Sequence, residues 1–129
     1  MNLTEHICHM AARYDAVAFD VFDTLIRRDT AAPTNLFRLR GEAFYTARTR
    51  AEREARAAKS GEVTLAEIYD RPCLAGYDPA QECAAELAAC TAYAPVQAAV
   101  QKLAQQGKKL YYISDMYLPQ TQINAMLRR

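Results

Sequence analysis

Two short apolar stretches of this chain end in polar side chains of the kind that handle phosphate groups. The residues concerned are Asp20, Asp23 and Thr24 after the stretch 16–19, and Ser114 and Asp115 after the stretch 110–113. A carboxylate such as Asp20 can attack phosphorus as a nucleophile, and a hydroxyl such as Ser114 can donate a hydrogen bond to a phosphoryl oxygen. Backbone N–H groups of the turn after Asp20 are expected to add to that stabilisation.

Both stretches are too short for helices and apolar throughout, which predicts buried strands of a parallel sheet. Ligands of open α/β sheets bind beyond the carboxyl ends of the strands. We therefore expect Asp20 and Ser114 to lie at one edge of the sheet.

The remainder of the chain is predicted to be helical. An apolar residue recurs every three to four positions at Leu3, Ile7, Met10 and Tyr14, which indicates an amphipathic first helix. Further helices are expected over residues 34–59, 64–69 and 79–93, from Pro95 to Gly107, and from Pro119 with Ile123, Met126 and Leu127 facing inward. The order of elements predicts an α/β fold with an incomplete parallel sheet and an inserted all-helical cap. We assign residues 1–31 and 95–129 to the core and residues 32–94 to the cap.

Local signals support several of these helix ends. Thr34 is placed to cap the helix over 34–59, and Thr64 with Glu67 fits a capping box. That long helix also carries cations at Arg38, Arg40, Arg48, Arg50, Arg53, Arg56 and Lys59. They form either a solvated face or, for one or two arginines, a grip on an anionic substrate.

Composition excludes several classes of protein. The chain has 129 residues, 51% of them hydrophobic, with 16 Lys and Arg against 15 Asp and Glu, for a net charge of +1. This balance provides no field to attract nucleic acid, and no apolar run reaches the roughly 20 residues of a membrane span. We expect no nucleic-acid or membrane partner and a cytoplasmic location. The four cysteines include no C-x-x-C pair, so they are expected to be reduced apolar residues rather than zinc ligands.

Two motifs carry a resemblance to a known family. FDVFDTLI, residues 19–26, resembles the first motif of the haloacid dehalogenase-like (HAD) hydrolase superfamily, and YYISD, residues 111–115, resembles its second. The chain also resembles members of a bacterial branch of this superfamily that is often found with glycosyltransferases and surface-polysaccharide genes. The segments that carry this resemblance are YDAVAFDVFDTLIRR, EVTLAEIYD and GKKLYYISDMYLP. The resemblance implies a Rossmann-like HAD core with a cap that closes over the site.

The resemblance also implies roles for individual residues. Asp20 would be the nucleophile of a phosphatase and a Mg²⁺ ligand, together with the backbone carbonyl of Phe22. Thr24 would shape the turn, and Ser114 would orient the phosphoryl group, with the N–H of Asp115 beside it. The substrate implied is a small phosphorylated metabolite.

The sequence departs from the family at the second position after the nucleophile. Phosphatases of the family carry an Asp there that protonates the leaving group, whereas this chain has Phe22. Asp23 lies one residue further and can serve only if the backbone turns sharply. An aromatic residue at this position is similar to the haloacid dehalogenases, whose aspartate displaces halide from carbon. A C–X hydrolase and a non-catalytic binding module therefore remain alternatives.

The family also needs a later Lys and later acidic residues, which we do not find after Asp115. Lys108 and Lys109 precede the second strand and so lie at the wrong end of the sheet. We therefore expect the chain to be the N-terminal portion of a larger HAD-like protein, or a truncated relative, and to be inactive by itself. The substrate and the oligomeric state stay open.

Overall fold

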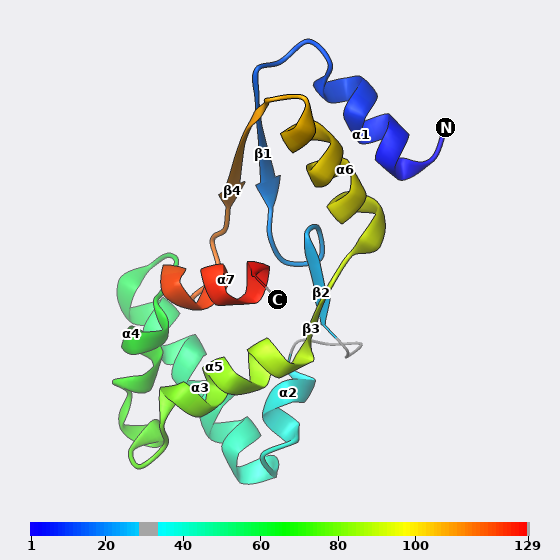
Figure 1. Ribbon diagram of the computed structural model, residues 1–129. Coiled ribbons are helices and arrows are strands. Elements are labelled where there is room, and N and C mark those ends of the chain that lie inside the picture. The colour runs from blue at the N-terminus through cyan, green and yellow to red at the C-terminus, as the bar shows by residue number, and fades with distance from the viewer. Residues whose placement is uncertain (29–33, 129) are drawn as a thin grey trace. The chain divides into compact units, whose positions relative to one another are not determined.

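The computed structural model describes residues 1–28 and 34–128 as a mixed α/β chain with a small parallel sheet (Figure 1). The chain divides into two compact units. We call residues 1–27 and 91–114 the sheet unit, and residues 28–90 and 115–128 the helical unit. The expected boundary between residues 31 and 32 lies outside the described residues, and the other boundary falls after residue 90 instead of 94.

The sheet unit is built on two parallel strands, β1 (Ala16–Asp20) and β4 (Lys109–Ile113). Helices α1 (Leu3–Ala11) and α6 (Ala94–Gln105) pack beside them, as Figure 1 shows. One cluster of buried residues in its core consists of Ala11, Phe19, Val96 and Leu103. Because one helix pair covers the strands, the apolar residues of one face supply this core.

The expectation that both strands are buried is wrong. Burial alternates along β1 and β4, and Tyr111 and Ile113 are 57% and 66% exposed. In a sheet covered on one side, every second side chain points to solvent. The first helix is confirmed, but its expected inward stripe is largely exposed at Leu3, Met10 and Tyr14. The side of this helix that packs against the core carries Ile7, Cys8 and Ala11 instead.

Among its described residues, the helical unit contains six helices. They are α2 (Asn35–Arg38), α3 (Glu42–Lys59), α4 (Leu65–Tyr69), the 3₁₀ helix η1 (Pro72–Leu74), α5 (Pro79–Ala89) and α7 (Gln120–Leu127). The single helix expected over 34–59 is interrupted between α2 and α3, where Gly41 has a φ of 101° that favours glycine. Thr34 makes no side-chain capping bond.

Two other local predictions, both of helix starts, are confirmed. The capping box of Thr64 and Glu67 is confirmed, and Pro79 occupies the first turn of its helix behind the capping side chain of Asp78. The helix expected up to residue 93 ends earlier, because β3 (Cys90–Ala92) follows it. This strand pairs with β2 (Ile26–Arg28), and the chain passes between the units within both strands.

The last helix belongs to the helical unit, although the sequence predicts that residues 95–129 lie together in the core. Ile123 and Met126 of α7 are buried, as expected of its inward face. They are held there by two hydrogen bonds within the helical unit. The Gln122 amide donates to the Cys83 carbonyl at 2.7 Å, and the Leu65 N–H donates to the Tyr117 carbonyl at 2.7 Å.

Candidate functional site

The carboxyl ends of β1 and β4 bring together two of the residues proposed for phosphate chemistry. In the parallel register, Asp20 lies opposite Ile113, and Ser114 follows directly on β4. Asp20 is exposed and Ser114 is half-buried. The pairing thus places a carboxylate and a hydroxyl at the ends of adjacent strands of the sheet unit. Asp115, which is exposed, begins the helical unit.

Thr24 is tied to the candidate nucleophile. Its hydroxyl donates a hydrogen bond to Oδ2 of Asp20 at 3.1 Å. A carboxylate held by one oxygen has fewer orientations to choose from. Thr24 therefore acts on the Asp20 side chain directly as well as shaping the turn.

The chain turns sharply after β1. Asp23 adopts a left-handed backbone conformation with a φ of 63°, which is uncommon for a residue with a side chain. The carbonyl of Val21 accepts hydrogen bonds from the N–H groups of Thr24, Leu25 and Ile26 at 2.9–3.3 Å. Such a constrained conformation next to a candidate nucleophile is a feature of functional sites. It is also the turn that Asp23 needs if it is to serve in proton transfer.

This turn corrects one expectation about anion binding. The N–H of Asp23 donates to the Ile26 carbonyl at 2.8 Å, and the next three N–H groups donate to Val21. These four donors are satisfied within the turn, so they do not point at a phosphoryl group. An anion at this site would depend on side-chain donors such as the Ser114 hydroxyl.

A magnesium ion needs oxygen ligands, and the site contains some of them. Asp20 provides a carboxylate, and the resemblance assigns the Phe22 carbonyl as a second donor. Mg²⁺ in proteins often has only one or two carboxylates and fills the remaining positions with water and substrate phosphate. Within residues 1–28 and 34–128, no three His, Cys, Asp or Glu side chains gather closely enough to hold a metal alone. The donors fit Mg²⁺ in kind, but they form only part of a site.

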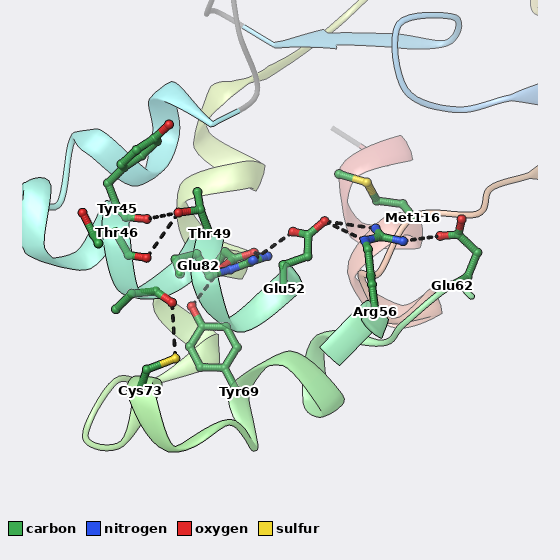
Figure 2. Close-up of polar contacts among 12 residues, drawn as sticks. Tyr45, Thr46, Thr49, Glu52, Arg56, Glu62, Tyr69, Cys73, Glu82 and Met116 are labelled. Atoms are coloured by element: carbon green, nitrogen blue, oxygen red, sulfur yellow. Dashed lines mark hydrogen bonds and ion pairs between the residues drawn. The ribbon is translucent and has the colours of Figure 1, made fainter. Parts of the chain in front are cut away.

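A second cluster of charged residues, not predicted from the sequence, lies inside the helical unit. Arg48 is fully buried, and it donates two hydrogen bonds to the Glu82 carboxylate at 2.6 and 2.9 Å and one to Glu52 at 2.9 Å. The Tyr69 hydroxyl donates to the same Glu82 at 2.8 Å. Figure 2 shows Tyr69 directed at Glu82, and Glu52 reaching onward to Arg56. We call Arg48, Glu52, Tyr69 and Glu82 the buried network.

A second buried ion pair lies within the same unit. Arg28 donates to Glu86 at 2.9 Å, and their side chains are only 6% and 1% exposed. Burial raises the pKa of Glu86, although the charges of Arg28 and Arg48 oppose the shift. For Arg48, burial alone would lower the pKa, but hydrogen bonding and the charge of Glu82 outweigh it and raise the pKa. Arg48 therefore stays charged.

The cations of the predicted cap helix are mostly engaged with neighbouring groups. The surface ion pairs are Arg38–Glu42, Arg50–Glu54, Arg56–Glu52, Arg56–Glu62 and Lys59–Glu67. Arg40 donates to Gln81 at 2.7 Å and lies over the Phe44 ring at 3.8 Å. The solvated-face interpretation holds for the pairs at the surface. It is wrong for Arg48, which is buried and has carboxylate partners, and so is not free to grip a substrate.

The sequence does contain a signal for this burial. Phe44, Ala51 and Ala55 form the buried stripe of α3, and position 48 falls on the same stripe. On α5, Glu82 and Glu86 are buried one turn apart, whereas Cys83 and Leu87 are only half-buried. A buried ion pair is indicated when an arginine lies in line with apolar positions on one helix and two glutamates lie four residues apart on another.

Comparison with known proteins gives no independent identification. No protein-family model matches the chain, and no curated protein is significantly similar to it. None of the helices within the described ranges 1–28 and 34–128 is both long and apolar enough to cross a membrane.

Proposed function

We propose that this chain carries the nucleophile of a HAD-like hydrolase acting on a small phosphorylated metabolite. The observation that supports this most is the parallel register of β1 and β4, with Asp20 opposite Ile113 and Ser114 next to it. The hydrogen bond from Thr24 to Asp20 adds to it. The Rossmann-like core implied by the sequence motifs is part of the same proposal.

In the proposed reaction, Oδ1 of Asp20 attacks phosphorus while Thr24 holds Oδ2. An O–P bond forms, the bond to the leaving oxygen breaks, and that oxygen takes a proton from water unless its anion is stable. Water then hydrolyses the acyl phosphate, which regenerates the carboxylate and releases inorganic phosphate. The Ser114 hydroxyl donates a hydrogen bond to the phosphoryl oxygens throughout.

Magnesium would be held by Asp20 and the carbonyl of Phe22. When bound, it supplies positive charge that offsets the charge of the phosphoryl group. Because the described residues provide only these donors, we expect weak Mg²⁺ binding and slow turnover.

The site lacks an obvious proton donor for the leaving group. Phe22 has no proton to give, so an alkyl phosphate, whose leaving oxygen needs a proton, is a poor substrate. Asp23 is the nearest carboxyl group in the sequence, and its left-handed backbone makes it the candidate acid and base. A phenolic leaving group with a stable anion bypasses this requirement.

The proposal predicts that the chain reacts with p-nitrophenyl phosphate and Mg²⁺ in a burst of p-nitrophenol, followed by little further turnover. The burst should coincide with phosphorylation of Asp20, detected by borohydride trapping and peptide mass spectrometry. Asp20→Asn should abolish both signals. The matched variant Asp23→Asn should retain the burst and slow the second phase, because only the later step needs a base.

Two outcomes would change this proposal. Absence of both burst and label in the unmodified chain would leave a non-catalytic HAD-like binding module, in which Asp20 and Ser114 only contact a ligand. Robust steady turnover that is lost in Asp20→Asn would preserve the role of Asp20 and contradict the expected inactivity of the chain.

Phe22 favours a second candidate function, hydrolysis of a carbon–halogen bond. Asp20 would displace halide from carbon to form an ester, which water hydrolyses to a hydroxy acid and the free carboxylate. Halide leaves without a proton, so Phe22 is no obstacle. This function predicts halide release from a 2-haloacid that is unchanged by EDTA and lost in Asp20→Asn; no halide release excludes it.

A further inference from the structure

Three segments connect the helical unit with the remainder of the chain, and one arginine joins residues near all three. Among residues 1–28 and 34–128, the chain crosses between the units after residues 27, 90 and 114. Arg28 directly follows the first crossing. Its Nε donates to Glu86 at 2.9 Å, and its Nη2 donates to the sulfur of Met116 at 3.9 Å. Glu86 lies on α5, four residues before the second crossing, and Met116 is the second residue after the third.

A guanidinium group is suited to this position because its N–H donors point in several fixed directions. One planar group thereby ties α5 to the segment that follows β4. The side chains of Arg28 and Glu86 are nearly fully buried, so water competes little for their hydrogen bond. Residues 26–28 are also paired through the backbone with Cys90–Ala92. A shift of any one of these segments would therefore strain or break a bond made by Arg28.

A buried ion pair such as Arg28–Glu86 is a poor means of gaining net stability. Taking two charges out of water costs about as much free energy as their attraction returns, so a well-packed apolar pair is often equally stable. Apolar contacts have no preferred direction, whereas hydrogen bonds weaken steeply when they are bent. We therefore expect the pair to define one arrangement of the segments more than it stabilises the fold.

We propose that Arg28 is a lock that holds the three connecting segments in one arrangement. While the bond between Arg28 and Glu86 is closed, β2, β3 and the segment around Met116 are fixed together. When this bond opens, all three segments loosen together. The lock needs no chemistry at Asp20, so it goes beyond the proposed function and is tested without a substrate.

Residue-resolved hydrogen exchange, together with NMR of methyl-labelled methionine, tests the lock. Arg28→Met should accelerate amide exchange in β2 and β3 by about tenfold or more, because local opening becomes easier. It should also broaden or split the methyl signal of Met116, which Met116→Leu assigns. Glu86→Gln should give the same pattern more weakly, including at Met116, because its effect reaches that residue through Arg28.

The double variant Arg28→Met/Glu86→Leu separates the order of the segments from the stability of the fold. It replaces the ion pair with apolar side chains of similar size, so the urea midpoint should return close to that of the unmodified chain. Exchange in β2 and β3 and the Met116 signal should stay as they are in Arg28→Met, because apolar contacts do not restore the directed bonds. A role in packing or stability alone would restore all three readouts.

Arg27→Met is the matched control, since it removes the same charge one position earlier. Arg27 is exposed, and its guanidinium lies 3.6 Å from the centre of the Tyr93 ring in the sheet unit. This variant should leave exchange in β2 and β3 and the Met116 signal unaltered. The same loss in Arg27→Met would overturn the proposal. So would a change in fewer than three of the segments in Arg28→Met, or full protection in the double variant. If Arg28→Met does not fold, Glu86→Gln and the double variant still decide these outcomes.

Discussion

Replacing Arg48 with methionine should lower the free energy of unfolding of the helical unit by about 3–5 kcal/mol, because it leaves a buried carboxylate without its partner. Glu82 is 2% exposed, and it receives two hydrogen bonds from Arg48. Methionine fills a similar volume, so the loss arises from charge and hydrogen bonding more than from a cavity. Urea denaturation followed by far-UV circular dichroism measures the change.

Two further variants separate the causes. Arg48→Met/Glu82→Gln should be more stable than Arg48→Met alone, because a neutral amide still accepts the Tyr69 hydroxyl bond without leaving an unpaired charge. Arg50→Met should lower the free energy of unfolding far less than Arg48→Met does, since the Arg50–Glu54 pair on the same helix is at the surface. Equal losses at positions 48 and 50 would contradict a structural role for the buried network.

The loss of stability in Arg48→Met should also depend on pH. Burial raises the pKa of Glu86, and the positive charges of Arg28 and Arg48 reduce this rise. Removing Arg48 therefore raises that pKa further. A carboxyl group whose pKa is higher in the folded state contributes stability at low pH and loses it as pH rises. Arg48→Met should thus be closer in stability to the unmodified chain at pH 5 than at pH 7.

Features set by neighbouring residues could be predicted from the sequence. The capping box of Thr64 and Glu67, the helix starting at Pro79 and the end of the first strand at Asp20 each depend on a few adjacent side chains. The meeting of Asp20 and Ser114 followed from parallel pairing, which fixes where strand ends lie. These parts of the candidate site needed only local patterns and one rule of topology.

Features set by distant contacts could not be predicted in this way. The apolar run of β4 is equally compatible with a strand covered on one face or on both, and only the partner elements decide. Strands β2 and β3 are three residues each, too short for a periodic pattern. Arg48 is buried because Glu82 meets it from 34 positions away, a pairing that propensities do not contain. The sequence predicts a turn after Asp20, but it does not indicate that the N–H groups of this turn are satisfied within it.

Leu103→Ala should lower the free energy of unfolding of the sheet unit by about 2–5 kcal/mol, through lost burial and a residual cavity. Leu103 is fully buried on α6, in a cluster with Ala11, Phe19 and Val96. The size of the loss depends on how far these neighbours can move in to fill the cavity. Hydrogen exchange measured by mass spectrometry is the suitable readout, because it reports each unit separately.

Exchange in Leu103→Ala should accelerate in β1, β4 and α6, while α3 and α5 keep their protection, because the buried network does not depend on this core. Val100→Ala is the matched control on the same helix. Val100 is half-buried, so we expect a cost of about 1 kcal/mol and a correspondingly small rise in exchange. If protection is lost equally in both units, they unfold together, and the two-unit description fails as an account of stability. If the strands keep their protection, the core of the sheet unit lies elsewhere than at Leu103.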